Sequence, residues 1–290
     1  MNENYVAVVG DINVDYLISI KKFPDYDGDV EVEELKMSGG GFGANTAYAL
    51  SKLGEVVLLF GCVGKDQNGE TALSDLKGKV DLSEIIKEGK TGVCFSVIDE
   101  SGVRRLMTYR GSNLLCDNSK FNLEKIGKAA WIHIAGLRLD NVNFLFKNLK
   151  INSWDPGMPF LDSLKDLPEF AERVGYIFLN EREFELLRLK FDAWKSFENI
   201  IVKMGEKGLS YFKKGKSVFK MPAFKVKALD STGAGDAFNA AFIHAMMKKS
   251  DVLYALKFAS ASGAISVMKF GARSVPDEFE IEKFLKEVKE

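Results

Sequence analysis

Short apolar runs rich in Val and Ile recur along most of the chain, separated by segments whose apolar residues have helical spacing. Strands that are apolar on both faces are typical of a parallel sheet covered by helices on each side. The predicted strands of this kind are residues 5–9, 56–60, 131–135, 151–154, 176–179 and 200–202. The predicted helices include residues 44–53, 66–76, 233–248, 252–268 and 278–288. This alternation predicts a doubly wound α/β fold, with a mainly parallel sheet flanked by helices.

Two regions break the alternation. Residues 30–36 alternate between apolar and charged side chains, which predicts a half-exposed strand. Residues 93–98 and 103–109 flank the turn sequence Asp-Glu-Ser-Gly, which predicts a hairpin. Because these strands do not fit a strand–helix rhythm, they could pair with one another as a small separate sheet.

The composition excludes several kinds of partner. The formal net charge is −1, so no bulk field favours nucleic acid or a membrane surface. The longest apolar run, residues 56–63, is far shorter than the ~20 residues of a membrane-spanning helix. Residues 1–4 lead into the first strand without the pattern of a signal peptide. We therefore expect a cytoplasmic protein with no nucleic-acid or membrane partner, and with Cys62, Cys94 and Cys116 as reduced core thiols.

Residues 228–242, ALDSTGAGDAFNAAF, place two glycines and an acidic residue where a helix is predicted to begin. A helix N-terminus carries free N–H groups and a partial positive charge, and glycines let those groups approach an anion closely. The pattern indicates an anion site at Gly233, Ala234 and Gly235, with Asp236 beside it as a base. We expect the helix dipole to keep Asp236 ionised. A tight turn with an N-cap is the alternative.

The P-loop sequence GxxxxGK[ST] is absent, as are the HRD and DFG motifs of protein kinases. Phosphoryl transfer in this chain would therefore use a different scaffold. Such a transfer needs donors that stabilise the moving phosphoryl group and a group that accepts the hydroxyl proton. The amides of residues 233–235 and the carboxylate of Asp236 could supply both.

Two further stretches carry polar residues next to predicted strand ends or helix starts. The glycine-rich residues 39–54 lead into a helix, but their spacing does not fit the dinucleotide motif GxGxxG. Asn45, at the start of that helix, suits a hydrogen bond to a neutral polyol. Residues 10–15, GDINVD, follow the first strand, where ligands of α/β sheets bind. Asn13 and Asp15 could accept or donate to sugar hydroxyls there, and a solvated turn is the alternative.

Three stretches together resemble the PfkB, or ribokinase-like, family of carbohydrate kinases. They are Gly-Gly-x-Gly-Ala-Asn at 40–45, Asp-x-Thr-Gly-Ala-Gly-Asp-x-Phe at 230–238, and GDINVD at 10–15. The resemblance runs in the family's order from Val6 to Pro276, and the second stretch is a highly specific signature. It implies one ribokinase-like kinase domain over residues 1–290. It also implies a small β-sheet lid over the substrate, made by residues near 16–38 and 91–111.

The resemblance implies a role for each matching residue on the acceptor side. Asp236 matches the family's catalytic base, which deprotonates a sugar hydroxyl, and Gly233, Ala234 and Gly235 match its anion hole. The positions that match sugar contacts are Asp15, Gly40, Gly41 and Asn45.

On the donor side, the resemblance implies ATP and Mg²⁺. Asn180 and Glu183 match an Asn-x-x-Glu motif that orders magnesium and phosphate, largely through water. The positions where the family holds the nucleotide are Lys203, Gly205 and Gly208, with Ser260 and Gly263 near the adenine. Asp230 and the backbone of Thr232, with residues 266–274, resemble a site for a monovalent cation such as K⁺.

The chain departs from ribokinases proper at two places, and these leave the acceptor open. Phe42 stands where ribokinases have Lys, which puts ribose in doubt. Tyr109 and Arg110 are more like fructokinases and 2-keto-3-deoxygluconate kinases, and Arg110 could pair with a sugar carboxylate through its planar fork. A surface Arg on a lid strand is the alternative reading of Arg110.

We therefore expect an ATP-dependent kinase of a small sugar or sugar acid. A nucleoside kinase of the same family is the nearest alternative, with Phe42 stacking on a base. A non-catalytic sugar- or nucleotide-binding regulator is a third hypothesis, and a dinucleotide oxidoreductase is a fourth. A homodimer through the lid is also open, because a small exposed sheet invites pairing.

Overall fold

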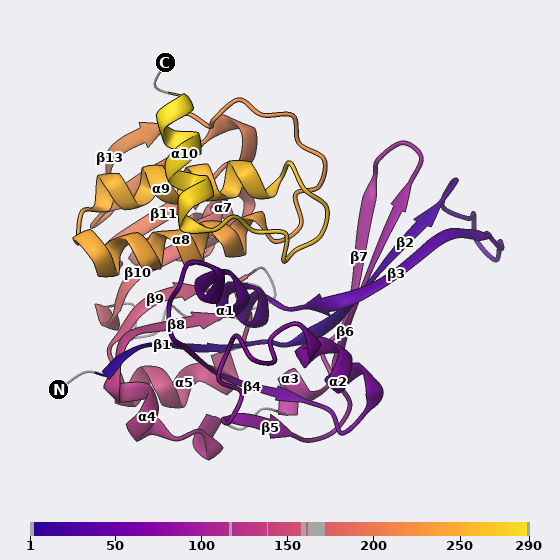
Figure 1. Ribbon diagram of the computed structural model, residues 1–290, viewed down its shortest axis with the longest axis horizontal. Helices are drawn as coiled ribbons and strands as arrows, with labels where there is room; N and C mark the ends of the chain where they lie inside the picture. The colour runs from indigo at the N-terminus through magenta and orange to yellow at the C-terminus, as the bar shows by residue number, and fades with distance from the viewer. Residues whose placement is uncertain (1–2, 116–117, 138, 158–160, 162–171, 289–290) are drawn as a thin grey trace.

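The computed structural model describes residues 3–115, 118–137, 139–157, 161 and 172–288. Its main sheet has nine strands in the order β13-β12-β11-β10-β9-β8-β1-β4-β5 (Figure 1). The strands are β1 (Glu3–Gly10), β4 (Val57–Val63), β5 (Ile85–Lys87), β8 (Ala129–Ala135), β9 (Ile151–Asp155), β10 (Val174–Asn180), β11 (Asn199–Lys203), β12 (Leu209–Lys213) and β13 (Lys216–Met221). The strands pair in parallel, except for β12 and β13 at one edge. All six predicted buried strands are confirmed.

Helices cover both faces of this sheet, and β1 shows why. Val6 and Val8 belong to one apolar cluster, with α1, α8, α9 and α10, whereas Ala7 and Val9 belong to a second, with α4, α5 and α7. The helices are α1 (Phe42–Lys52), α2 (Gln67–Ser74), α3 (Ser112–Leu115), α4 (Leu123–Lys128), α5 (Leu139–Asn148), α7 (Glu181–Lys190), α8 (Ala234–Lys249), α9 (Val252–Ser266) and α10 (Glu278–Glu287), with short 3-10 turns at Asn118–Lys120, Asp192–Ser196 and Gly205–Lys207. The doubly wound α/β prediction is therefore confirmed.

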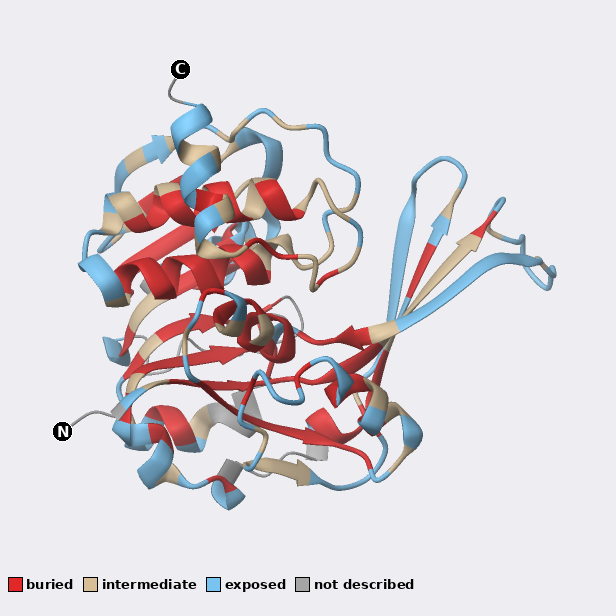
Figure 2. Cartoon of the chain, viewed as in Figure 1, coloured by how far each residue is buried: buried red, intermediate tan, exposed pale blue. Residues whose placement is uncertain are grey.

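Four strands form a second, smaller sheet that projects from the main body (Figure 1). This small sheet consists of β2 (Asn13–Ile20), β3 (Val32–Gly40), β6 (Gly92–Asp99) and β7 (Arg104–Tyr109), in the order β3-β2-β6-β7. Asp11 and Ile12 alone separate β1 from β2. Figure 2 shows buried residues concentrated in the central strands of the main sheet and in the helix faces packed on them, whereas the small sheet is largely exposed beyond its base.

The small sheet corrects two details of the sequence-based prediction. Residues 13–15 are not a solvated turn after the first strand but the beginning of β2. The strand predicted at residues 30–36 is β3, which begins at Val32 and continues to Gly40 because Asn13 and Val14 pair with Gly40 and Gly39. The predicted hairpin is confirmed as β6 and β7.

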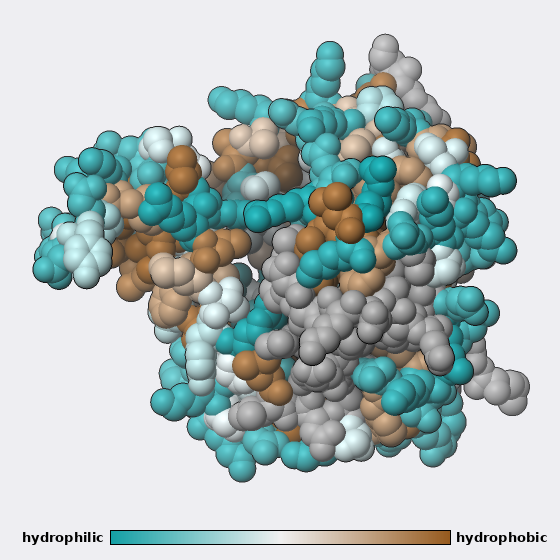
Figure 3. All heavy atoms as spheres, turned by 180° about the vertical axis from the view of Figure 1, so that it is seen from behind, coloured by the Kyte–Doolittle hydropathy of each residue, from teal (hydrophilic) through white to brown (hydrophobic). Residues whose placement is uncertain are grey.

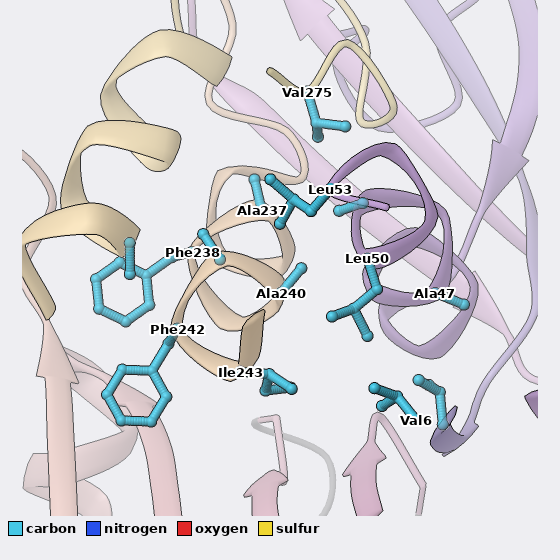
Figure 4. Packing of buried hydrophobic residues seen from close by; sticks show 14 of the residues in the cluster. Val6, Ala47, Leu50, Leu53, Ala237, Phe238, Ala240, Phe242, Ile243 and Val275 are labelled. Atoms are coloured by element: carbon cyan, nitrogen blue, oxygen red, sulfur yellow. The ribbon is translucent and has the colours of Figure 1, made fainter. Parts of the chain in front are cut away.

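Helices α1 and α8 lie side by side, and small side chains allow their close approach. Leu50 of α1 faces Ala240 and Ile243 of α8 in Figure 4, and all three side chains are fully buried. Small residues at a helix contact let the backbones approach, because little side-chain volume separates them. This packing brings the first turns of the two helices together, and both turns contribute to the site described below.

The cysteines correct another expectation. Cys62, buried in β4, is disulfide-bonded, so it is not a reduced thiol. Cys94 in β6 is free, and Cys116 lies outside the described residues. Among the described helices, none is long and apolar enough to cross a membrane.

Candidate active site

Asp236 lies in the first turn of α8, as predicted, directly after the glycine-rich loop. Gly233 is the N-cap, with a left-handed backbone at φ 74°, and no side chain caps the helix there. A Cβ at Gly233 would lie 2.4 Å from the carbonyl oxygen of Ala272, so a larger residue would not fit. The backbone N–H groups at the start of a helix attract an anionic ligand. One of them, that of Ala234, also donates to the Ser231 carbonyl at 3.3 Å.

The Asp236 carboxylate is only 4% exposed and accepts a hydrogen bond from Asn45 Nδ2 at 3.0 Å. Burial raises its pKa well above the usual range, with a further increase from Asp155, and the contributions of Asn45 and Lys203 oppose the shift without cancelling it. Burial therefore opposes the ionised form of Asp236, which we expect the helix dipole to favour. A carboxylate with a raised pKa is a stronger base, which suits proton transfer from a hydroxyl group.

Near Asp236, three polar side chains from three elements form hydrogen bonds with one another. Lys203 Nζ, at the end of β11, donates to Asp155 Oδ2 at 2.8 Å and to Asn239 Oδ1 at 3.1 Å. Asn239 Nδ2, in α8, donates to the same Asp155 oxygen at 2.6 Å. The sequence analysis did not identify Asp155 or Asn239. Asp155 follows a predicted strand directly, at the edge where α/β proteins bind ligands, and that position could have indicated it.

On the acceptor side, Asp15 of β2 lies against Gly40 of β3. A Cβ at Gly40 would lie 2.3 Å from the Asp15 carboxylate, so this contact requires glycine. Burial raises the pKa of Asp15 to about 6, although Arg273 lowers it. Arg273 Nε in turn donates to Asn45 Oδ1 at 3.3 Å, so it joins Asp15 to the Asn45–Asp236 pair. Sequence reasoning missed Arg273 as an acceptor-side residue.

A second buried carboxylate, Asp11, lies between β1 and β2. It accepts hydrogen bonds from Gly43 N at 3.2 Å and from Asn13 Nδ2 at 3.1 Å. Burial raises its pKa to about 7, opposed by the Gly43 amide and by the charge of Arg110. The Arg110 guanidinium, half-buried, donates weakly to the Gly136 carbonyl at 3.5 Å. Asp11 stands in the predicted GDINVD stretch, but its role was not predicted.

The residues predicted to contact the substrate therefore lie close together. Asn13 Oδ1 accepts from Asn113 Nδ2 at 2.8 Å, so the small sheet is tied to the chain after β7. Gly41 has φ 95°, and a Cβ there would lie 2.5 Å from the Asp11 carbonyl oxygen. The residues brought together at this end of the site are Asp11, Asn13, Asp15, Gly40, Gly41, Asn45, Arg110, Asn113 and Arg273.

Asn180 and Glu183 form a capping box at the start of α7. Asn180 Oδ1 accepts from the Glu183 amide, and Glu183 Oε2 accepts from the Asn180 amide, both at 2.8 Å. Burial and the nearby Asp155 charge raise the pKa of Glu183 to about 7, opposed by the Asn180 amide and Lys203. A buried carboxylate whose charge is disfavoured by a neighbouring carboxylate fits a nearby divalent cation. The described residues contain no group of three or more acidic, His or Cys side chains, so such an ion would also need phosphate or water ligands.

Two of the residues predicted to hold the nucleotide, Gly208 and Ser260, lie against Met221 of β13. A Cβ at Gly208 would lie 2.0 Å from the Met221 carbonyl oxygen, and Ser260 Oγ lies 3.9 Å from Met221 Sδ. Gly205 and Gly208 have φ values of 57° and 95°, which only glycine adopts readily. Gly263 of α9 lies against the beginning of α8, with its Cβ position 3.6 Å from the Ala234 carbonyl oxygen. Three segments are thus neighbours: the loop after β11, helix α9, and residues 233–235 at the start of α8.

Asp230 organises the loop that precedes α8. Its Oδ1 accepts from the Thr232 amide at 2.9 Å and the Thr232 hydroxyl at 2.6 Å, and its Oδ2 accepts from the Gly271 amide at 2.9 Å. Burial alone would raise its pKa, but these bonds and the charge of Arg104 lower it overall. Arg104 reaches this loop from β7, where Nη1 donates to Thr232 Oγ1 at 3.2 Å.

The site lies where the strand order of the main sheet reverses. Strands β4 and β5 lie on one side of β1, and β8 to β13 lie on the other. Ligands of open α/β sheets bind outside the carboxyl ends of the strands at such a point. Here that edge carries the first turn of α8, the buried Asp236 carboxylate and a cluster of carboxylates and amides, which together suit the transfer of a phosphoryl group to a hydroxyl.

Comparison with known proteins agrees with this chemistry. A ribokinase structure from Thermotoga maritima has a TM-score of 0.84 at 25% identity and covers 98% of this chain and 100% of its own. A nucleoside kinase from Methanocaldococcus jannaschii also has a TM-score of 0.84 at 25% identity, with 99% of both chains covered. An ATP-dependent ribose-1-phosphate kinase from Halopiger xanaduensis is 31% identical, with 97% of this chain and 98% of that protein covered.

The model of the pfkB family carbohydrate kinases matches residues 3–278. That match spans the main sheet, the small sheet and α8. The chain therefore belongs to the pfkB family of carbohydrate kinases, phosphotransferases whose acceptor is a hydroxyl group.

Proposed function

We propose that this kinase transfers the γ-phosphoryl group of ATP to a hydroxyl of a ribose-type sugar that carries an anionic group. The observation that carries the catalytic part is the Asp236 carboxylate, buried in the first turn of α8 and held by Asn45 at 3.0 Å. A buried base beside a helix N-terminus has little use in a protein that only binds sugars or nucleotides. This argues against a non-catalytic regulator.

Arg110 is the reason for proposing that the acceptor sugar carries an anionic group. Its half-buried guanidinium has five N–H donors, and its hydrogen bond to Gly136 is long, at 3.5 Å. Arg pairs with planar carboxylates and with phosphates through two parallel bonds. The relative from Halopiger xanaduensis that phosphorylates ribose 1-phosphate makes that sugar phosphate the first acceptor to test. A sugar carboxylate is the second.

In the reaction, the acceptor hydroxyl gives its proton to Asp236 while its oxygen bonds to the γ-phosphorus. The bond between the γ-phosphorus and the bridging oxygen breaks, and ADP leaves. The amides of residues 233–235 would hold the oxygens of the transferring group. Asp15, Asn13, Asn45 and the Gly40–Gly41 backbone would orient the sugar.

On the donor side, the loop residues Gly205 and Gly208, with Ser260 and Gly263, would hold the nucleotide. Glu183, oriented by Asn180, could bind Mg²⁺ through water; that ion neutralises phosphate charge when it is bound. Asp230 and Thr232 could belong to a K⁺ site, as the family resemblance implies. Both Asp230 oxygens already accept protein N–H or O–H groups, so we expect at most a supporting contribution from this carboxylate.

A panel of acceptors tests the proposed function. Purified protein is incubated with ATP and Mg²⁺ and with ribose, ribose 1-phosphate, sugar acids or nucleosides, and product is followed by phosphorus NMR. We expect ribose 1-phosphate or a sugar acid to give the highest kcat/KM, and Arg110→Met to lower that value about 10- to 100-fold with little change for ribose. A preference for nucleosides would support the alternative, in which Phe42, 42% exposed, stacks on the base.

A catalytic control belongs with the panel. Asp236→Asn should leave acceptor and ATP binding nearly unchanged and reduce kcat by more than about 100-fold. Turnover within about tenfold of the wild type, or about 1.4 kcal/mol of barrier, would remove Asp236 as the base.

We also propose that the small sheet serves as a lid and as a dimer contact. Asp15 lies on one face of the sheet, and the opposite face carries the row Met37, Tyr16, Phe95 and Met107. Met37 and Met107 are 50% and 56% exposed, and Tyr16 stacks on Phe95 at 5.4 Å. Figure 3 shows hydrophobic residues gathered on the projecting part of the molecule. An exposed apolar face of this kind is typical of a protein contact.

A further inference from the structure

Lys203 has a place in the site that a nucleotide contact alone does not explain. Its Nζ donates to Asp155 and to Asn239, and Asn239 completes the triangle through Asp155. An ammonium group has three N–H donors, so one remains for an acceptor outside this triangle. Residues of β9, β11 and α8 therefore hold the Lys203 ammonium in position and leave one of its N–H groups for another acceptor.

The ammonium lies next to the anion loop. A Cβ at Gly235 would lie 3.3 Å from Lys203 Nζ, so the absence of a side chain at residue 235 keeps open the space above the ammonium. The same glycine belongs to the first turn of α8, whose amides face an incoming anion. A phosphoryl oxygen held by these amides would also come within reach of Nζ.

The surroundings strengthen the effect of this charge. The Lys203 side chain is 18% exposed, its partner Asp155 is 7% exposed, and the Phe178 ring centroid lies 5.8 Å from Nζ. Charges act more strongly where water is largely excluded. Burial dominates the raised pKa values of Asp236 and Glu183, but Lys203 lowers both, so its charge acts on the base and on the nucleotide side together.

We propose that Lys203 is a further catalytic residue, whose third N–H binds an oxygen of the transferring phosphoryl group while Asp155 and Asn239 hold the ammonium in position. The inference rests on the proposed kinase reaction and goes beyond nucleotide binding. Negative charge on the phosphoryl group is stabilised during transfer by fixed donors, and a positioned cation is the strongest of these. The effect should therefore appear in kcat more than in the KM for ATP.

The test compares Lys203→Met with Lys248→Met. Lys248 also pairs with a carboxylate, that of Glu278, at 2.6 Å. It lies in the last turn of α8, at the other end of the helix from Asp236. We expect Lys203→Met to lower kcat at least about 100-fold, as loss of one such donor does elsewhere, and to change the KM for ATP by less than about threefold. Lys248→Met should keep wild-type kinetics.

Two further readouts separate catalysis from folding and from nucleotide affinity. The acid limb of the kcat–pH profile should move to higher pH in Lys203→Met, because the cation that lowers the pKa of Asp236 is gone. Calorimetric binding of ADP with aluminium fluoride, a mimic of the transferring group, should weaken at least about tenfold, while binding of ADP alone changes little. Where Lys203→Met does not fold, Lys203→Gln, whose amide can still donate to Asp155, is expected to show the same losses.

The proposal is overturned if kcat stays within about threefold of the wild type, or if the whole loss lies in the KM for ATP and in ADP affinity. Either result leaves the kinase assignment intact, because the wild-type enzyme would still phosphorylate its acceptor. Failure of the wild type to phosphorylate any acceptor of the panel would instead reject the proposed function, and with it this inference.

Discussion

Asn45 and Asp236 are 191 residues apart in sequence, yet Asn45 Nδ2 lies 3.0 Å from Asp236 Oδ2. The bond joins the first turn of α1 to the first turn of α8, and therefore the glycine-rich residues 39–43 to the loop at residues 230–233. Asn45 Oδ1 is fixed in turn by Arg273 Nε at 3.3 Å. The amide thus has its donor end on the base and its acceptor end on a cation, which fixes its orientation.

This pair makes a testable prediction. In Asn45→Ala, Asp236 loses the donor that lowers its pKa, so the acid limb of the kcat–pH profile should move upward and kcat should fall at least about tenfold. Asn148→Ala is the control, because Asn148 is exposed and bonds only within α5 to the Phe144 carbonyl at 2.7 Å. An unchanged profile in Asn45→Ala would show that this bond does not tune the base.

Gly40 is predicted to be indispensable for acceptor binding. In Gly40→Ala, the new methyl group would overlap the Asp15 carboxylate, which lies 2.3 Å from the Cβ position, so the acceptor KM should rise by more than about tenfold. Gly127→Ala is the matched control, because its Cβ would meet only the tip of Leu149, at 3.3 Å. Steady-state kinetics and thermal melting of both variants check this, and equal acceptor KM values would contradict it.

Arg104 and Arg105 are neighbours on β7 with opposite surroundings. Arg104 reaches Thr232 at 3.2 Å in the loop before α8, whereas the Arg105 guanidinium lies 3.8 Å over the Phe23 ring. If the small sheet closes over the acceptor, Arg104→Ala should raise the acceptor KM about three- to tenfold, and Arg105→Ala should not. Equal effects of the two substitutions would show that the contact with Thr232 does not hold the sheet closed.

The buried carboxylates predict how stability depends on pH. The folded-state pKa of Asp11 is about 7, raised from 3.8 chiefly by burial. A group whose pKa is raised on folding stabilises the protein fully below its unfolded pKa, and that contribution is lost as the pH rises through the folded value. The wild type should therefore lose this stability between about pH 4 and pH 7.

Asp11→Asn removes that titration. Relative to the wild type, the free energy of unfolding of the variant should improve as the pH rises from about 4 to 7, by at least about 1 kcal/mol. Urea unfolding at several pH values measures it. A difference between the two proteins that does not change with pH would mean that Asp11 is not buried as a raised-pKa acid in solution.

The apolar face of the small sheet predicts self-association. Met107→Glu should shift a dimer toward monomer in sedimentation velocity, because an exposed apolar contact would then have to bury a charge. Leu253→Glu is the control, because Leu253 is 57% exposed but lies on α9, away from the small sheet. A wild-type protein that is monomeric at all concentrations would reject the dimer.

Much of the fold could be predicted, because strands that are apolar on both faces appear in the sequence as short, nearly continuous apolar runs. β2 could not be identified from GDINVD, because Asn13 and Asp15 are polar although the strand is buried at that end. Asp236 stood out through the glycines before it. By contrast, Asn239 and Arg273 carry no such signal in the sequence, and only the packing of distant elements brings them to the site. Asp155 had a weaker signal, its position at the end of a predicted strand. The raised pKa of Asp236 could not be predicted from the sequence either, because the burial that causes it depends on the tertiary structure.

The short connection through Asp11 and Ile12 has a mechanical consequence. Both residues are buried, so β2 continues from β1 with no free chain between the main sheet and the small sheet. Any tilt of the small sheet would carry Asn13 and Asp15 with it, so a movement of this sheet would also move the side chains proposed to orient the acceptor. A chimaera that carries the small sheet of another kinase should therefore acquire the substrate preference of that kinase together with the motion of its sheet.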